Sequence, residues 1–153
     1  MRAILDANVY ISYLLSPDAD TPPKLLVDAA ISGAYALLLT EKVLTEVRHK
    51  TATKPYLAAR ITQPRVERLI EILDAVAEAI ADVAEPFPEL GPDRKDDYLF
   101  AHAAVGRADY PVSGDFGVQG VGRIGDVRIA TPAEFLQILR DAGWEPQPTG
   151  DLR

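Results

Sequence analysis

Cysteine is absent from this chain of 153 residues. Its absence excludes disulfides, thiolate metal sites and a cysteine nucleophile. Any metal ion would therefore be held mainly by oxygen ligands, which suit hard cations such as Mg²⁺ and Mn²⁺. The sequence also has no phosphate-binding Gly-Lys motif and no Ser–His–Asp order, so these two common routes to phosphate binding and nucleophilic catalysis find no support.

Long hydrophobic runs are missing as well. The apolar stretch that follows Met1 and Arg2 is too short for a signal peptide and far too short to cross a membrane, so we expect a cytoplasmic protein. No internal repeat or low-complexity tract divides the chain. At this length, with 48% hydrophobic residues, we expect one domain over residues 1–144 and a flexible tail over 145–153.

Positive charge is scarce overall but unevenly spread. The net charge of −7 argues against a nucleic-acid partner, because phosphate backbones favour lysine and arginine. Residues 48–68, here called the basic zone, nevertheless carry six basic residues and one acid, a net charge of +5. This zone is compatible with RNA, with an acidic partner or with a solvated helix surface. Our candidates for RNA contacts are Arg48, Lys50, Lys54 and Arg60.

Short apolar segments alternate with helical patterns along the chain. The predicted strands are 2–5, 35–39, 110–113 and 127–130, with an extended piece at 82–87. The predicted helices are 8–15, 22–33, 40–50, 64–81, 93–108 and one that starts at Pro132. Pro22 and Pro23 open the second of these helices, and Thr40 caps the third. This alternation predicts a three-layer α/β/α sandwich with a mainly parallel central sheet. In such sheets, ligands lie beyond the carboxyl ends of the strands.

Two of the predicted strands are followed by an aspartate. Asp6 comes directly after the first strand, and Asp115 lies just past the strand that ends at Ser113. Each has an ordinary alternative role, Asp6 as the N-cap of the next helix and Asp115 as a turn residue. Asn8 and Ser113 lie beside these acids, where they could orient a carboxylate or a water.

Two predicted helices carry further acids. Asp93, Asp96 and Asp97 share one helical stripe with Phe100, so at least two of these carboxylates are expected to point inward. Asp93 could instead cap the helix, with Asp96 reaching back to it, whereas Asp97 has no equally good structural role. Glu46 lies at the edge of the apolar stripe of its own helix, where an ordinary glutamate would be solvated.

The four acids Asp6, Glu46, Asp97 and Asp115 can converge on one edge of the sheet. Clustered carboxylates repel one another, and a divalent cation removes that cost. Such an ion can activate a water and neutralise the charge that develops on a phosphodiester. The joint pattern therefore predicts a Mg²⁺ or Mn²⁺ site.

Five stretches in this order, LDANVYIS, TEKVLTEV, DDYLFAHA, YPVSGDFG and IATPAEFL, resemble a PIN domain. More narrowly, they are similar to the VapC-like toxin ribonucleases of bacterial toxin–antitoxin pairs, from about Arg2 to Leu139. The resemblance implies metal-dependent RNA cleavage that leaves a 5′-phosphate, a homodimer, and inhibition by a small antitoxin. It assigns catalysis and metal binding to Asp6, Glu46, Asp97 and Asp115, with support from Asn8, Ser113 and Asp96.

Gly117 departs from this family, in which a second acid often stands two residues after the strand-end aspartate. Its presence weakens the case for a second metal ion and favours one alternative, a degenerate PIN domain that binds RNA or protein without cutting. The intact set of four acids argues against that alternative. A phospho-receiver domain is a third possibility, but Asp6 has no adjacent acid and no lysine follows the last strand.

Overall fold

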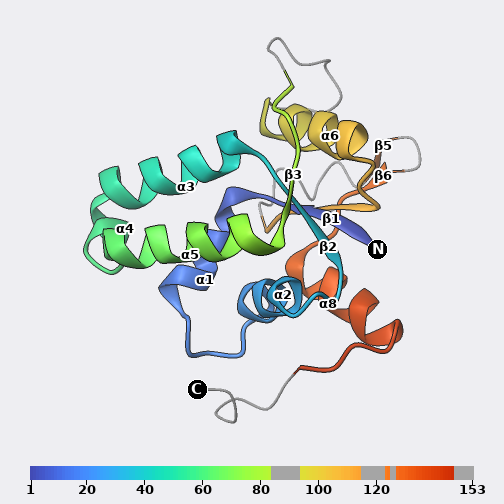
Figure 1. Ribbon diagram of the computed structural model, residues 1–153, viewed down its shortest axis with the longest axis horizontal. Helices are drawn as coiled ribbons and strands as arrows, with labels where there is room; N and C mark the ends of the chain where they lie inside the picture. The colour runs from blue at the N-terminus through green and yellow to red at the C-terminus, as the bar shows by residue number, and fades with distance from the viewer. Residues whose placement is uncertain (84–93, 115–122, 125–126, 147–153) are drawn as a thin grey trace.

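The computed structural model describes residues 1–83, 94–114, 123–124 and 127–146 (Figure 1). Strands and helices alternate through most of this part of the chain, as predicted. The elements in order are β1 (Arg2–Leu5), α1 (Ala7–Leu15), α2 (Pro22–Ile31), β2 (Ala36–Leu39), α3 (Glu41–Thr53), α4 (Pro55–Ala58), α5 (Gln63–Val76), β3 (Glu78–Ala79), α6 (Arg94–Gly106), β4 (Tyr110–Val112), β5 (Arg123–Ile124), β6 (Val127–Arg128) and α8 (Pro132–Asp141).

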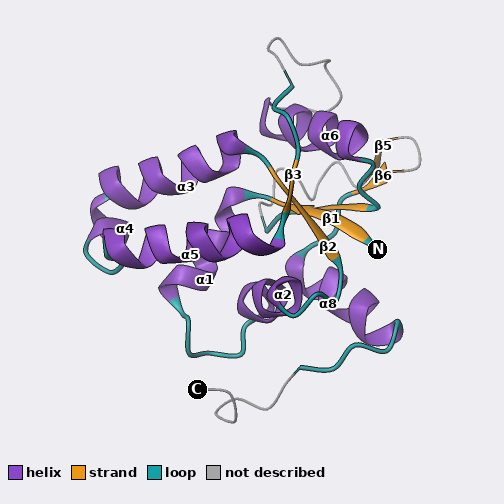
Figure 2. Ribbon diagram, in the orientation of Figure 1, coloured by secondary structure: helices purple, strands orange, loops and turns teal. Residues whose placement is uncertain are grey.

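Four parallel strands form the central sheet in the order β3-β2-β1-β4 (Figure 2). β1 lies inside the sheet and pairs with β2 on one side, where Ile4 is opposite Leu38. On its other side it pairs with β4, where Leu5 is opposite Val112. Because all four strands run the same way, their carboxyl ends meet at one edge of the sheet.

Side chains of β1 alternate between two apolar cores, one on each face of the sheet. Ala3 and Leu5 belong to the larger core, which includes side chains from α1, α2, α3, α5 and α8. Ile4 belongs to the smaller core, together with Leu99 and Phe100 of α6. Figure 1 shows α6 on one side of the strands and α2 and α8 on the other. The predicted three-layer α/β/α sandwich with a parallel sheet is therefore confirmed.

Threonine caps begin three of the helices. The hydroxyls of Thr21 and Thr40 each accept a hydrogen bond from the backbone N–H three residues later, at 3.4 and 3.2 Å. Thr131 and Glu134 form a reciprocal capping box at the start of α8. Each cap satisfies N–H groups that have no partner within the helix, and a cap of this kind stabilises by about 1 kcal/mol.

The helix predicted over 64–81 is too long, since α5 ends at Val76 and Glu78–Ala79 form β3 instead. β3 pairs with β2, and the N–H of Ile80 donates to the carbonyl of Leu39 at 2.9 Å. Alanine and glutamate favour helix locally, but the unpaired edge of β2 offers these residues backbone hydrogen bonds. Pairing with a distant strand therefore overrides the local propensity.

The strand predicted over 127–130 is also only partly correct. Val127–Arg128 pair with β5 in a separate antiparallel ladder, and only Ala130 reaches the main sheet, through a single bridge to Val112. Residues 84–87 of the predicted extended piece and residues 147–153 of the predicted tail lie outside the described part. None of the described helices is long and apolar enough to cross a membrane.

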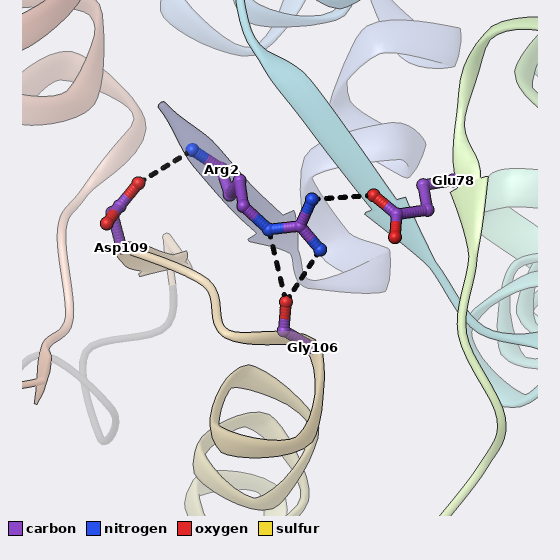
Figure 3. A network of polar contacts seen from close by, with 4 residues as sticks. All are labelled: Arg2, Glu78, Gly106 and Asp109. Carbon is purple, nitrogen blue, oxygen red and sulfur yellow. Dashed lines mark hydrogen bonds and ion pairs between the residues drawn. The ribbon is translucent and has the colours of Figure 1, made fainter.

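Arg2, the first residue of β1, makes polar contacts with β3, with the end of α6 and with the loop before β4 (Figure 3). Its guanidinium donates to the carbonyl of Gly106 at 2.7 and 3.2 Å and pairs with Glu78 at 2.7 Å. Its backbone N–H donates to the carboxylate of Asp109 at 2.8 Å. At Gly106 an added Cβ would lie 2.7 Å from Cδ1 of the buried Leu38, so glycine permits the end of α6 to approach β2 closely.

We expect Arg2→Met to lower the urea midpoint of unfolding, because the carbonyl of the buried Gly106 loses its side-chain donor. Glu78→Gln removes only the ion pair, whose glutamate is 52% exposed, and should lower the midpoint less than Arg2→Met does. Urea unfolding followed by circular dichroism measures both values. Equal losses in the two variants would contradict the role given to the carbonyl contact.

Candidate metal centre at the carboxyl edge of the sheet

Asp6 lies directly after β1, at the carboxyl edge of the sheet. Its N–H donates to the carbonyl of Val112 at 2.9 Å, which continues the pairing of β1 with β4 past the strand end. The hydroxyl of Ser113 donates to Oδ2 of Asp6 at 3.0 Å. Ser113 is fully buried, and its own N–H donates to the carbonyl of Ala130 at 3.0 Å. Two neighbouring strand ends thus fix the position of the Asp6 carboxylate.

The structure also tests the capping role considered for Asp6. Asp6 occupies the N-cap position of α1, with φ −65° and ψ 152°, but its side chain makes no capping hydrogen bond. The threonines at the starts of α2, α3 and α8 do make such bonds. N-capping therefore does not explain the carboxylate of Asp6.

Glu46 of α3 and Asn8 of α1 form a polar cluster with Lys50. The Nζ of Lys50 lies 2.9 Å from Oε1 of Glu46, one helical turn earlier, and 3.5 Å from Oδ1 of Asn8. Glu46 is also close enough to Asp6 for its charge to act on that carboxylate. The structure therefore brings together Asp6, Glu46 and Asn8, as the sequence predicted, and adds a lysine to them.

Burial raises the pKa of Asp6 above its ordinary value, and the negative charge of Glu46 raises it further. The Ser113 hydroxyl, the backbone N–H of Ala7 and the positive charge of Lys50 lower the pKa, but they do not cancel the increase. The folded protein thus disfavours the charged form of Asp6. A divalent cation beside these two acids would relieve their repulsion and stabilise both charges.

Tyr98 links the start of α6 to the start of α3. Its hydroxyl is hydrogen-bonded to the hydroxyl of Thr40, the N-cap of the helix that carries Glu46. Burial raises the pKa of Tyr98, and the charges of nearby carboxylates, Asp6 among them, raise it as well, so the phenol is neutral. Because Tyr98 directly follows Asp97, this contact fixes the backbone next to that predicted ligand.

Tyr10 of α1 is buried near the same acids. Its hydroxyl has no hydrogen-bond partner within the described part of the chain. Burial raises its pKa and the negative charge of Asp6 adds to the effect, so this hydroxyl also keeps its proton. A buried polar atom without a partner is costly, and it is expected where a further group completes the site.

The chemistry of these donors fits a hard divalent cation. Asp6, Glu46 and Asn8 offer carboxylate and amide oxygens, which Mg²⁺ and Mn²⁺ prefer. Among the side chains that the structure describes, no group of three or more acids and histidines forms a metal site. The pair of Asp6 and Glu46 is therefore the part of the predicted acid set that the structure brings together.

Three other predicted site residues lie outside the described side chains. Asp96 and Asp97 stand in the first turn of α6, where the structure describes the backbone alone. Asp115 and Gly117 belong to the segment 115–122, which is not described. The participation of these acids stays a prediction, as does the capping role of Asp93.

The basic zone is partly neutralised within the protein. Arg48 donates two hydrogen bonds to Glu67, at 2.8 and 3.1 Å. Lys54 and Arg60 are exposed, and none of the ion pairs seen among the described side chains involves them. The guanidinium of Arg60 lies 4.6 Å from the centre of the Tyr56 ring, a cation–π contact that leaves its donors accessible.

A pocket of about 130 Å³ adjoins the cluster, with room for a group larger than a single water. It opens where the start of α1 meets the first residues of α2 and α8. Its lining residues are Asn8, Val9, Ser12, Pro23, Gly114 and Pro132. Asn8 belongs both to the lining of the pocket and to the polar cluster.

Sequence reasoning missed several participants. Lys50 was predicted as an RNA contact, although its position four residues after Glu46 is a signal for an ion pair on one helix face. Thr40 was predicted only as a cap, and its contact with Tyr98 joins helices far apart in the sequence. Tyr10 follows the helical pattern of α1 like any core residue, so no sequence signal relates it to the acids.

The sequence matches the PIN domain family over residues 2–117, and the chain belongs to this family. PIN domains are generally nucleases and typically use divalent metal ions. Among solved structures, the fold is similar to a chain of the crystal structure of VapBC2 from Rickettsia felis, which is bound to a DNA fragment from the promoter of these proteins. The TM-score is 0.58 and the sequence identity is 15%, and the match covers 86% of this chain and 98% of that chain. A comparison with curated protein sequences found no match.

We expect Asp6→Asn to stabilise the protein at pH 7 in EDTA by about 1 kcal/mol, which corresponds to ~2–4 °C in Tm. Because the pKa of Asp6 is raised on folding, its ionisation disfavours the folded state. This cost is absent below the ordinary pKa of 3.8 and grows as the pH rises through the folded value. The gain in Tm should therefore disappear on acidification.

Thermal unfolding between pH 3 and pH 8 measures this effect. Asp74→Asn is the matched control, since it removes the same charge from an exposed position on α5. A lower Tm for Asp6→Asn than for the wild type at pH 7 would show that the ionised carboxylate stabilises the fold, contrary to this expectation.

Proposed function

We propose that this PIN domain is a divalent-metal-dependent endoribonuclease that hydrolyses RNA phosphodiesters, and that it is the toxin of a toxin–antitoxin pair. The observation that carries the proposal is the position of Asp6 at the carboxyl edge of the sheet, held there by Ser113, where burial and the charge of Glu46 disfavour its ionised form. Membership of a family whose members are generally nucleases supports it. A repulsive pair costs stability, and a metal centre gives a reason to keep it.

In this proposal the metal ligands and catalytic acids are Asp6, Glu46, Asp97 and Asp115, supported by Asn8, Ser113 and Asp96. These residues would hold a Mg²⁺ or Mn²⁺ ion, which would supply activation of the attacking water and neutralisation of the charge that develops on the phosphodiester. Ser113 orients the carboxylate of Asp6 by donating a hydrogen bond to its Oδ2. Cleavage breaks the bond to the 3′ oxygen and leaves a 5′-phosphate.

The partners belong to the same proposal. Exposed Lys54 and Arg60 would bind the RNA backbone, together with Arg48 and Lys50 once these leave their acidic partners. The similar Rickettsia felis structure contains VapBC2, which supports an antitoxin that covers the acidic edge. The proposal also includes assembly into a homodimer and location in the cytoplasm.

We expect Asp97→Asn and Asp6→Asn each to reduce cleavage by roughly a hundredfold or more, because each removes a charged ligand of the ion. The assay is cleavage of labelled total RNA with Mn²⁺ or Mg²⁺ against EDTA. The control Asp74→Asn changes the same charge away from the site and should keep its activity.

Cleavage that persists in EDTA, or that survives in Asp97→Asn, would contradict the proposed mechanism. Absence of both cleavage and a metal-induced change in Tm would instead favour a PIN domain that binds without cutting.

The basic zone yields a separate prediction about RNA binding. The test uses the Asp97→Asn variant, in which the RNA is expected to stay intact. In this background, Lys54→Glu should weaken RNA binding at every salt concentration. It should also reduce by about 1 the slope of the logarithm of the association constant against the logarithm of the salt concentration. Arg140→Glu makes the same charge change at an exposed position on α8 and serves as the control. Fluorescence anisotropy with labelled RNA measures both. Indistinguishable binding by the two variants would remove the basic zone from the RNA interface.

A further inference from the structure

The ammonium group of Lys50 lies where a cation is expected. Its Nζ is 2.9 Å from Oε1 of Glu46 and 3.5 Å from Oδ1 of Asn8. Its positive charge also acts on Asp6, against the charge of Glu46. One ammonium thus contacts Glu46 of α3 and Asn8 of α1 and acts electrostatically on Asp6 at the end of β1.

An exposed salt bridge between residues one helical turn apart does not share these properties. The pair of Arg68 and Glu71 on α5 is of that kind, with side chains 69% and 72% exposed. Lys50 and Glu46 are 21% and 35% exposed, and Asn8 from a second helix joins them. The lower exposure reduces screening by water, so the charge of Lys50 acts more strongly on its neighbours.

We propose that Lys50 is the internal counter-ion of the metal centre: it neutralises Glu46 and Asp6 in the metal-free protein and must leave Glu46 before a divalent ion binds there. This inference rests on the metal site of the proposed function. It follows from charge, because an ammonium within 3 Å of Glu46 and a divalent ion on the same carboxylate repel each other. Lys50 and the metal ion therefore compete for one carboxylate.

The competition has two consequences. Without metal, Lys50 offsets the repulsion between Asp6 and Glu46, so the fold keeps these acids together at a lower cost. With metal, the displaced ammonium stays attached to α3 beside the same edge, where a phosphate of the substrate becomes its partner. Lys50 is thus a positioning residue that exchanges a carboxylate for a phosphate when the centre is loaded.

The test is calorimetric titration of the full-length, metal-stripped protein with MnCl₂. Lys50→Met removes the charge and keeps most of the side-chain length in a helix that tolerates methionine. We expect it to bind Mn²⁺ about three- to tenfold more tightly than the wild type, because the competing charge is gone. Lys54→Met, an equal charge loss at the exposed end of the same helix, should change the affinity less than about twofold.

A second readout separates competition from a merely structural role. In EDTA, Lys50→Met should have a lower Tm than the wild type, since the acids lose their counter-ion, and its gain in Tm on adding Mn²⁺ should be larger. Lys50→Arg keeps the charge and should restore values close to the wild type. If Lys50→Met does not fold in EDTA, the Mn²⁺ affinities of Lys50→Gln, which removes the charge, and Lys50→Arg, which keeps it, are compared instead.

Equal or weaker Mn²⁺ binding by Lys50→Met, compared with Lys54→Met, would overturn the role of Lys50 and leave the metal centre intact. Failure of the wild type and of every variant to bind Mn²⁺ would overturn the metal centre, and with it both the proposed function and this inference. Tighter Mn²⁺ binding in Lys50→Met alone, with rescue by Lys50→Arg, would establish the competition.

Discussion

The pairing of β1 with two strands that are distant in the sequence determines where the candidate site residues lie. β1 is parallel both to β2 and to β4, and Leu5 stands opposite Val112. This register places Asp6 next to Ser113 and brings the start of α3 to the same edge. The position of the candidate metal centre therefore depends on the sheet register rather than on any local motif.

The arrangement of acids at the candidate centre lowers the stability of the fold. Asp6 is partly buried and stands near a second carboxylate, and both conditions disfavour its charge. The hydroxyl of Ser113 and the ammonium of Lys50 offset part of that cost. Functional sites often keep such unfavourable arrangements, because activity needs charges that a purely structural core would exclude. Around Asp6, the surrounding polar groups reduce the conflict without removing it.

Features encoded by neighbouring residues were predictable from the sequence. The apolar run of β1, the cap at Thr40 and the prolines that open α2 and α8 depend on local chemistry, and each was recognised. The end of α5 at Val76 and the contact of Lys50 with Asn8 were not, because they depend on packing between distant segments. The same limit applies to the acid set: its convergence was predicted from strand ends, and the structure describes it for Asp6 and Glu46.

The strand order also determines when, during translation, the neighbours of Asp6 become available. β1 leaves the ribosome well before its second neighbour β4, because Asp6 and Ser113, which follow the two strands, are 107 positions apart and translation proceeds at about 5–20 residues per second. Until Ser113 emerges, Asp6 lacks both the hydroxyl that orients it and the adjoining strand. Under the proposed function, a nascent chain that still lacks β4 has an incomplete centre and does not cut RNA.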